Sequence, residues 1–126
     1  MAQAVYEISR EGPVTRIEFL QSPERDDLLA LISDLAELED SQLRLYVFLQ
    51  TELLATTADM RAAAGVAREG NRQPDRVAIV APGNVTYTIT RVFKVFRESE
   101  ITTLAIFRDL EEARAWLVSD APPPDS

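Results

Sequence analysis

Histidine and cysteine are both missing from the 126 residues of this chain. Without them there is no Ser-His-Asp or Cys-His nucleophile pair, no zinc site of the usual thiolate and imidazole type, and no disulfide. The carboxylate clusters are explained by helix ends, and no acid/base pair stands out among them. The sequence therefore predicts a protein that is not an enzyme and that needs neither a metal nor a cofactor.

Positive charge is scarce, with 13 basic residues against 21 acidic ones and a net charge of −8. Binding to a phosphate polymer depends on clustered Lys and Arg, so the balance argues against a nucleic-acid partner, although a local basic patch stays compatible with it. No apolar run approaches the roughly 20 residues of a membrane span. The first twelve residues lack the pattern of a secretory signal. These features predict a cytoplasmic protein.

What is present suits one globular domain. With 46% hydrophobic residues, a chain of this length can bury a core without a metal or a disulfide. We expect a single domain over residues 1–119. The proline-rich residues 120–126 are expected to form a disordered tail.

The first third of the chain predicts a hairpin followed by a helix. Alternating residues indicate strands over 4–10 and 14–20, separated by Gly12-Pro13. Ser22 is the expected N-cap of a helix with Pro23 at its first position, ending near Leu38. Its inner stripe is Leu28, Leu31, Ile32, Leu35 and Leu38.

The rest of the chain alternates helices with buried strands. Residues 43–49, 77–81 and 103–107 are almost continuously apolar, as expected for parallel strands covered on both faces. A helix is expected from Thr56 or Thr57 to Glu69. Residues 85–98 fit a helical stripe at more positions than a strand, so a helix is predicted there. Asp109 is the expected cap of a last helix over 110–118.

This order predicts an α/β fold: a single mixed, mostly parallel five-stranded sheet with an antiparallel N-terminal strand and about four helices packed on it. Three stretches carry a resemblance to a known family: 76–82, the helix that includes Phe93 and Phe96, and 106–117 with Trp116. They resemble the C-terminal half of SpoIIAA-like proteins of the STAS superfamily, named for sulphate transporters and anti-sigma-factor antagonists. With the early strands and helix, the resemblance spans roughly residues 4–118.

The resemblance implies a domain that binds a partner or a small apolar or anionic ligand and does not catalyse a reaction. In the antagonist branch, an Asp-Ser motif after a central strand is phosphorylated by a partner kinase. The matching region here, Gln50-Thr51-Glu52-Leu53, lacks that pair. Thr51 is the hydroxyl that could take a phosphate, and an ordinary solvated loop is the alternative.

Ligands of open α/β sheets bind outside the carboxyl ends of the strands. Three loops meet that description here: 50–57, 82–86 and 108–109. The candidate ligand-binding residues on the first two, with the residue that follows, are Gln50, Thr51, Pro82, Gly83, Asn84, Thr86 and Tyr87. A plain turn in which Asn84 caps the next helix is the competing interpretation.

A partner-binding face is predicted on the helix that follows. Tyr87, Arg91 and Lys94 lie off the apolar stripe, and an aromatic ring flanked by cations can dock a partner. A solvated helix face is the alternative. Trp116 is expected in the core, with a dimer seam as the alternative.

The leading hypothesis for function is therefore a non-catalytic STAS-like domain that acts through a protein partner or as a homodimer. The alternative is a carrier of a small ligand or lipid, with a pocket at the carboxyl ends of the strands. An enzyme that uses carboxylate chemistry is the third hypothesis.

Overall fold

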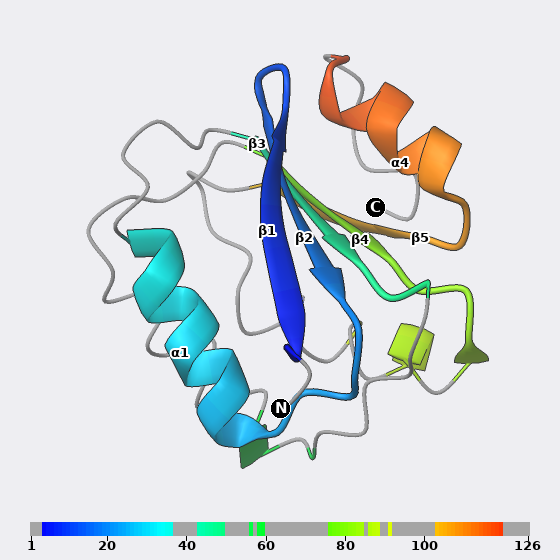
Figure 1. Cartoon of the computed structure of the whole chain (residues 1–126). Helices are drawn as coiled ribbons and strands as arrows, with labels where there is room; N and C mark the ends of the chain where they lie inside the picture. The colour runs from blue at the N-terminus through cyan, green and yellow to red at the C-terminus, as the bar shows by residue number, and fades with distance from the viewer. Residues whose placement is uncertain are drawn as a thin grey trace.

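A mixed five-stranded sheet lies at the centre of the computed structural model, in the order β1-β2-β3-β4-β5 (Figure 1). The structure describes residues 4–36, 43–49, 56, 58–59, 76–84, 86–88, 91 and 103–119. Its strands are β1 (Tyr6–Glu11), β2 (Val14–Phe19), β3 (Leu43–Val47), β4 (Arg76–Val80) and β5 (Thr103–Phe107). Only β1 and β2 pair antiparallel; the other neighbours are parallel. The predicted fold class is confirmed.

The hairpin of β1 and β2 turns at Gly12-Pro13. Gly12 has a φ of +60°, the left-handed region that glycine adopts without steric cost. Six residue pairs follow in continuous register, from Glu11 opposite Val14 to Tyr6 opposite Phe19.

Helices α1 (Arg25–Ala36) and α4 (Leu110–Leu117) cover opposite faces of the sheet (Figure 1). Successive strand residues alternate between these faces, which explains why the central strands β3, β4 and β5 are mostly apolar. On the α1 side the buried residues are Ile17, Phe19, Leu28, Leu31, Leu35, Phe48, Val77, Ile79, Ala81, Leu104 and Ile106. On the α4 side they are Val14, Leu45, Val47, Ala78, Val80, Ala105, Phe107, Ala113, Trp116 and Leu117.

Helix α1 begins at Arg25, two residues later than the sequence indicated. The Asp27 carboxylate accepts a hydrogen bond of 2.9 Å from the backbone N–H of Glu24, the residue before the first helical one. Pro23 lies before the helix and is buried. The predicted end near Leu38 lies outside the described residues.

Helix α4 confirms the predicted cap and the predicted core position of Trp116. The Asp109 carboxylate accepts a 3.0 Å hydrogen bond from the N–H of Glu112. Trp116 is only 6% exposed, and its ring packs 5.6 Å from that of Phe107. The Arg76 guanidinium lies 3.9 Å from the centre of the Trp116 ring and covers it.

Two further helices are described at their beginnings. Thr56 and Asp59 exchange side-chain hydrogen bonds with each other's backbone N–H at 3.1 and 3.2 Å, an N-terminal capping box. Asn84, Thr86 to Thr88 and Arg91 are helical, which confirms helix over strand where they are described. Phe93, Phe96 and the tail 120–126 lie outside the described residues. No helix in the described ranges is long and apolar enough to cross a membrane.

Candidate functional site

The turn after β4 lies at the carboxyl ends of the parallel strands. The backbone N–H of Ala81 donates to the carbonyl of Phe107 at 2.7 Å, which continues the β4–β5 pairing beyond the ends of both strands. Pro82 and Asn84 are exposed, and a helix starts at Asn84 with the Tyr87 N–H bonded to the Gly83 carbonyl at 2.9 Å. Gly83 lacks a positive φ, so this turn does not require glycine for its conformation.

Arg108, the residue after β5, joins this turn to the end of the neighbouring strand. Its Nη1 donates to the Pro82 carbonyl at 3.2 Å and to the Asn84 side-chain carbonyl at 2.8 Å. Its guanidinium lies 4.2 Å from the centre of the Tyr87 ring. Two of the three loops predicted to form a site are therefore brought together by this one side chain.

Arg91 approaches Tyr87 from the next turn of the helix. Its Nη1 donates to the Tyr87 hydroxyl at 3.3 Å, and its guanidinium carbon lies 5.7 Å from the ring centre. Tyr87 is half-buried and packs against the α1-side core, whereas Arg91 and Arg108 are exposed. We call Asn84, Tyr87, Arg91 and Arg108 the arginine–tyrosine cluster.

The cluster is suited to binding anions. Guanidinium groups present several N–H donors in a plane that matches a carboxylate or a phosphate. The Tyr87 ring, the Pro82 carbonyl and the Asn84 side-chain carbonyl fix the orientation of Arg108, which lowers the entropy lost on binding. These two cations are a local exception on a chain with a net charge of −8.

Not every residue singled out from the sequence falls in the cluster. Thr86 is 1% exposed, so its hydroxyl lies beneath the surface. Gln50, Thr51 and Lys94 lie outside the described residues, and their roles stay predictions. Arg108 was included in a candidate loop but not singled out; the parallel pairing of β4 and β5 is the signal that places it beside Pro82.

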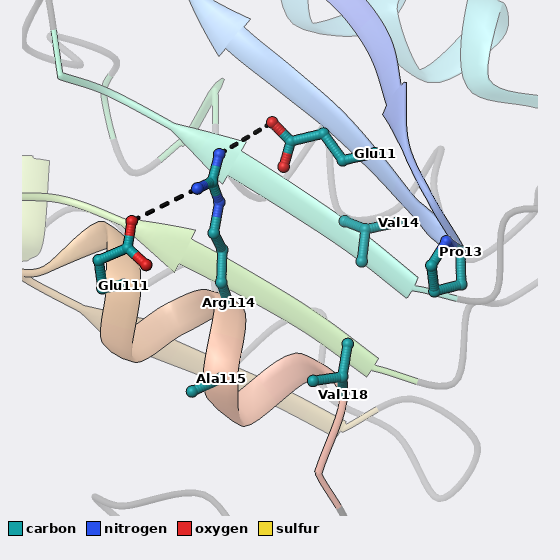
Figure 2. Close-up of a pocket in the computed structure, with 7 residues that line it drawn as sticks. All are labelled: Glu11, Pro13, Val14, Glu111, Arg114, Ala115 and Val118. Atoms are coloured by element: carbon teal, nitrogen blue, oxygen red, sulfur yellow. Dashed lines mark hydrogen bonds and ion pairs between the residues drawn. The ribbon is translucent and has the colours of Figure 1, made fainter.

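A groove lies at the opposite, amino end of the parallel strands. It has a volume of about 360 Å³ and lies between the β1–β2 turn and α4, lined by Glu11, Pro13, Val14, Glu111, Arg114, Ala115 and Val118 (Figure 2). Arg114 pairs with Glu11 at 2.9 Å and with Glu111 at 3.4 Å across it. These ion pairs already use the charges of the groove, and its place does not match the predicted ligand pocket.

Glu11 also pairs with Arg16 at 2.8 Å, and Arg16 pairs with Glu18 at 2.9 Å. Burial by itself raises the pKa of the Glu11 carboxyl, but the hydrogen bond from Arg16 and the charges of Arg114 and Arg16 outweigh it and lower the pKa. Burial by itself lowers the pKa of Arg16, but the hydrogen bonds to Glu11 and Glu18 and their negative charges outweigh burial, so the Arg16 pKa is raised. The network holds β1, β2 and α4 together.

No protein-family model matches the chain, and no curated protein matches its sequence. Among solved structures, it is similar to an uncharacterized protein of the DUF3478 family from Shewanella loihica PV-4, described as having a SpoIIAA-like fold. The two share 18% sequence identity with a TM-score of 0.60, over 93% of this chain and 98% of the other.

This similarity, together with the mixed sheet and its helices, defines an α/β protein with a SpoIIAA-like fold. The resemblance drawn from the sequence is thereby confirmed at the level of fold. At 18% identity the neighbour carries no activity over to this chain.

Proposed function

We propose that this chain is a non-catalytic STAS-like binding domain that acts through a protein partner held at the arginine–tyrosine cluster. The observation that carries the proposal is the half-buried Tyr87 ring with the exposed Arg108 and Arg91 guanidiniums at 4.2 and 5.7 Å from its centre. Tyr and Arg are among the residues that contribute most to protein–protein affinity.

The partner's chemistry follows from the charge of the site. A segment rich in Asp or Glu is attracted to the two guanidiniums and repelled by the acidic remainder of the chain, which carries 21 acidic residues in total. Such a contrast favours one docking position over others. The Tyr87 ring offers an apolar surface between the two charges.

A binding role is also supported by the small number of side-chain types that could catalyse a reaction. The sequence has no His or Cys, and the described residues hold no group of three or more Asp and Glu side chains arranged for a metal ion. The neighbour with the same fold is itself uncharacterized, so this support comes from the chain's own residues.

A small anionic ligand is the second candidate, because Arg108 and the turn at Pro82–Asn84 also suit a phosphate group. Two features favour a protein segment instead. The Thr86 hydroxyl is buried, and one Arg108 nitrogen is already bonded to Pro82 and Asn84. Binding of an acidic peptide and binding of inorganic phosphate distinguish the two candidates.

The test measures fluorescence anisotropy of labelled decaglutamate and decaglutamine peptides with the wild type and with Arg91→Ala and Arg108→Ala. Each variant should weaken decaglutamate binding at least about tenfold, since a lost charged hydrogen-bond partner costs about 1.5–3 kcal/mol. Arg25→Ala, which removes an exposed arginine at the start of α1, is the matched control and should leave the affinity unchanged.

Equal binding of decaglutamine, or decaglutamate binding that none of the variants weakens, would contradict the proposal. A thermal-shift series with inorganic phosphate tests the second candidate. Stabilisation by phosphate that requires Arg108, without peptide binding, would replace the protein partner by a small anion.

A further inference from the structure

Strand β1 forms one edge of the sheet and, among the described strands, pairs with β2 alone. The N–H of Leu20 donates to the carbonyl of Val5 at 2.8 Å, so Val5 bonds toward β2. Hydrogen bonding alternates along an antiparallel pair, and Glu7 and Ser9 therefore also bond toward β2. The N–H and C=O groups of Tyr6, Ile8 and Arg10 consequently point away from the sheet.

Two of the usual protections against edge pairing are missing from β1. Natural edges are blunted by proline, bulges or charged side chains; β1 has six residues in continuous register with no Pro among them, and its charges, on Glu7, Arg10 and Glu11, limit the registers in which it can pair. In the described part of the chain, no hydrogen bond reaches the outward backbone groups of Tyr6, Ile8 or Arg10. In Figure 1, β1 lies in front of the other strands, between α1 and α4.

We propose that β1 pairs antiparallel with β1 of a second copy of this chain, with Ile8 on the two-fold axis. In this register Ile8 faces Ile8, Tyr6 faces Arg10 of the second copy, and Glu7 faces Ser9. A two-fold axis at Glu7 would oppose Glu7 to itself, and one at Ser9 would oppose Glu7 to Glu11. Like charges directly opposite destabilise a sheet, so of the three axes near the middle of β1 the charge pattern favours the one at Ile8.

Charge complementarity identifies a second copy of this chain as the partner that pairs with the β1 edge. The Tyr6 hydroxyl donates to the Asp34 carboxylate of α1 at 2.5 Å, so this carboxylate lies near the first residue of β1. Arg10 lies at the other end of the strand, exposed, and forms no ion pair with the described residues of its own chain. The two-fold axis brings Arg10 of the second copy beside Tyr6 and Asp34. By symmetry this contact occurs two times in the dimer.

The pairing joins the two sheets edge to edge and does not involve the arginine–tyrosine cluster. That cluster lies after β4 and β5, at the far side of the sheet from β1. The dimer therefore displays two copies of the cluster, which would increase the avidity for a partner that has two acidic segments. The dimer itself does not depend on the proposed function.

Cross-linking tests the register, and the absence of native cysteine makes it specific. Glu7 and Ser9 are both exposed, and as a non-hydrogen-bonded pair their Cα atoms would lie about 4.5 Å apart, within disulfide range. A mixture of the Glu7→Cys and Ser9→Cys chains should form mixed disulfide dimers under mild oxidation. Either chain alone should not, because identical positions would lie about 8 Å apart. Equal cross-linking in all three samples would overturn this register.

Sedimentation velocity from about 1 µM to about 1 mM measures the dimer itself. Arg10→Glu places two like-charged contacts against Asp34 and should raise the dissociation constant at least tenfold. Arg91→Glu makes the same charge change at the cluster and should leave dimerisation intact while weakening decaglutamate binding. A wild type that stays monomeric over this range would overturn the dimer without affecting the proposed function.

Discussion

The guanidinium of Arg108 lies 4.2 Å from the centre of the Tyr87 ring, although one residue follows β5 and the other lies in the helix after β4. The same guanidinium bonds the side-chain carbonyl of Asn84 at 2.8 Å. One side chain thus ties the ends of two neighbouring parallel strands. Its position is fixed before any ligand arrives.

Replacing Arg108 tests whether this tie has a structural as well as a binding role. We expect Arg108→Ala to lower the free energy of unfolding by about 1 kcal/mol, because an exposed cation–π contact and exposed hydrogen bonds contribute little each. Urea unfolding followed by circular dichroism measures it. Asn84→Ala should cost less, and Arg25→Ala should have no effect. A loss above about 3 kcal/mol would mean that Arg108 is chiefly structural.

The fold could be predicted from the sequence because its signals are local. The alternation over residues 4–10 and the apolar runs at 43–49, 77–81 and 103–107 each follow from one strand's own environment, and all were confirmed as strands. The start of α1 was less predictable, because Ser22, Pro23 and the acidic residues after them all offer N-terminal signals. The helix begins at Arg25, where the Asp27 carboxylate accepts a bond from the Glu24 N–H.

The candidate site could be predicted only in part. Pro82, Asn84 and Tyr87 are close in sequence, and turn chemistry pointed to them. Arg108 reaches them only through the parallel pairing of β4 with β5, which a single sequence indicates as a topology but not as a side-chain contact. The Tyr6–Asp34 bond is another such long-range contact.

Tyr6 should make the protein sensitive to alkaline pH. Burial, the hydrogen bond to Asp34, and the charges of Asp34 and Asp27 raise its pKa from 10.0 to about 12. A group whose pKa is higher in the folded state contributes stability that is complete below pH 10 and is lost as the pH rises toward 12. In Tyr6→Phe this alkaline loss should shrink. Urea unfolding between pH 9 and pH 12 measures it, and the tyrosinate absorbance of the folded wild type should show one late titration that Tyr6→Phe lacks.

Glu11 should contribute at the acid end of the pH range. Its folded-state pKa lies below the ordinary value of 4.5, so its stabilising effect is present above about pH 4.5 and is lost as the pH falls through the folded pKa. Glu11→Gln should therefore be less stable than the wild type near pH 7, by about 1 kcal/mol or less because these pairs are partly solvated. The difference should shrink in acid. Glu24→Gln is the matched control at an exposed position, and a difference that stays constant down to pH 2 would contradict the prediction.

Thr15 should be better replaced by valine. It is completely buried on β2, and its hydroxyl oxygen has no hydrogen-bond partner among the residues that the structure describes. Burying an unsatisfied hydroxyl costs about 1–3 kcal/mol, and valine has nearly the same shape without the polar group. Thr15→Val should therefore raise the free energy of unfolding by about 1 kcal/mol, measured by urea unfolding. Thr15→Ser keeps the hydroxyl and removes a methyl group from the core, so it should destabilise the protein instead. If Thr15→Val were the less stable of the two, the hydroxyl would have to be satisfied in solution.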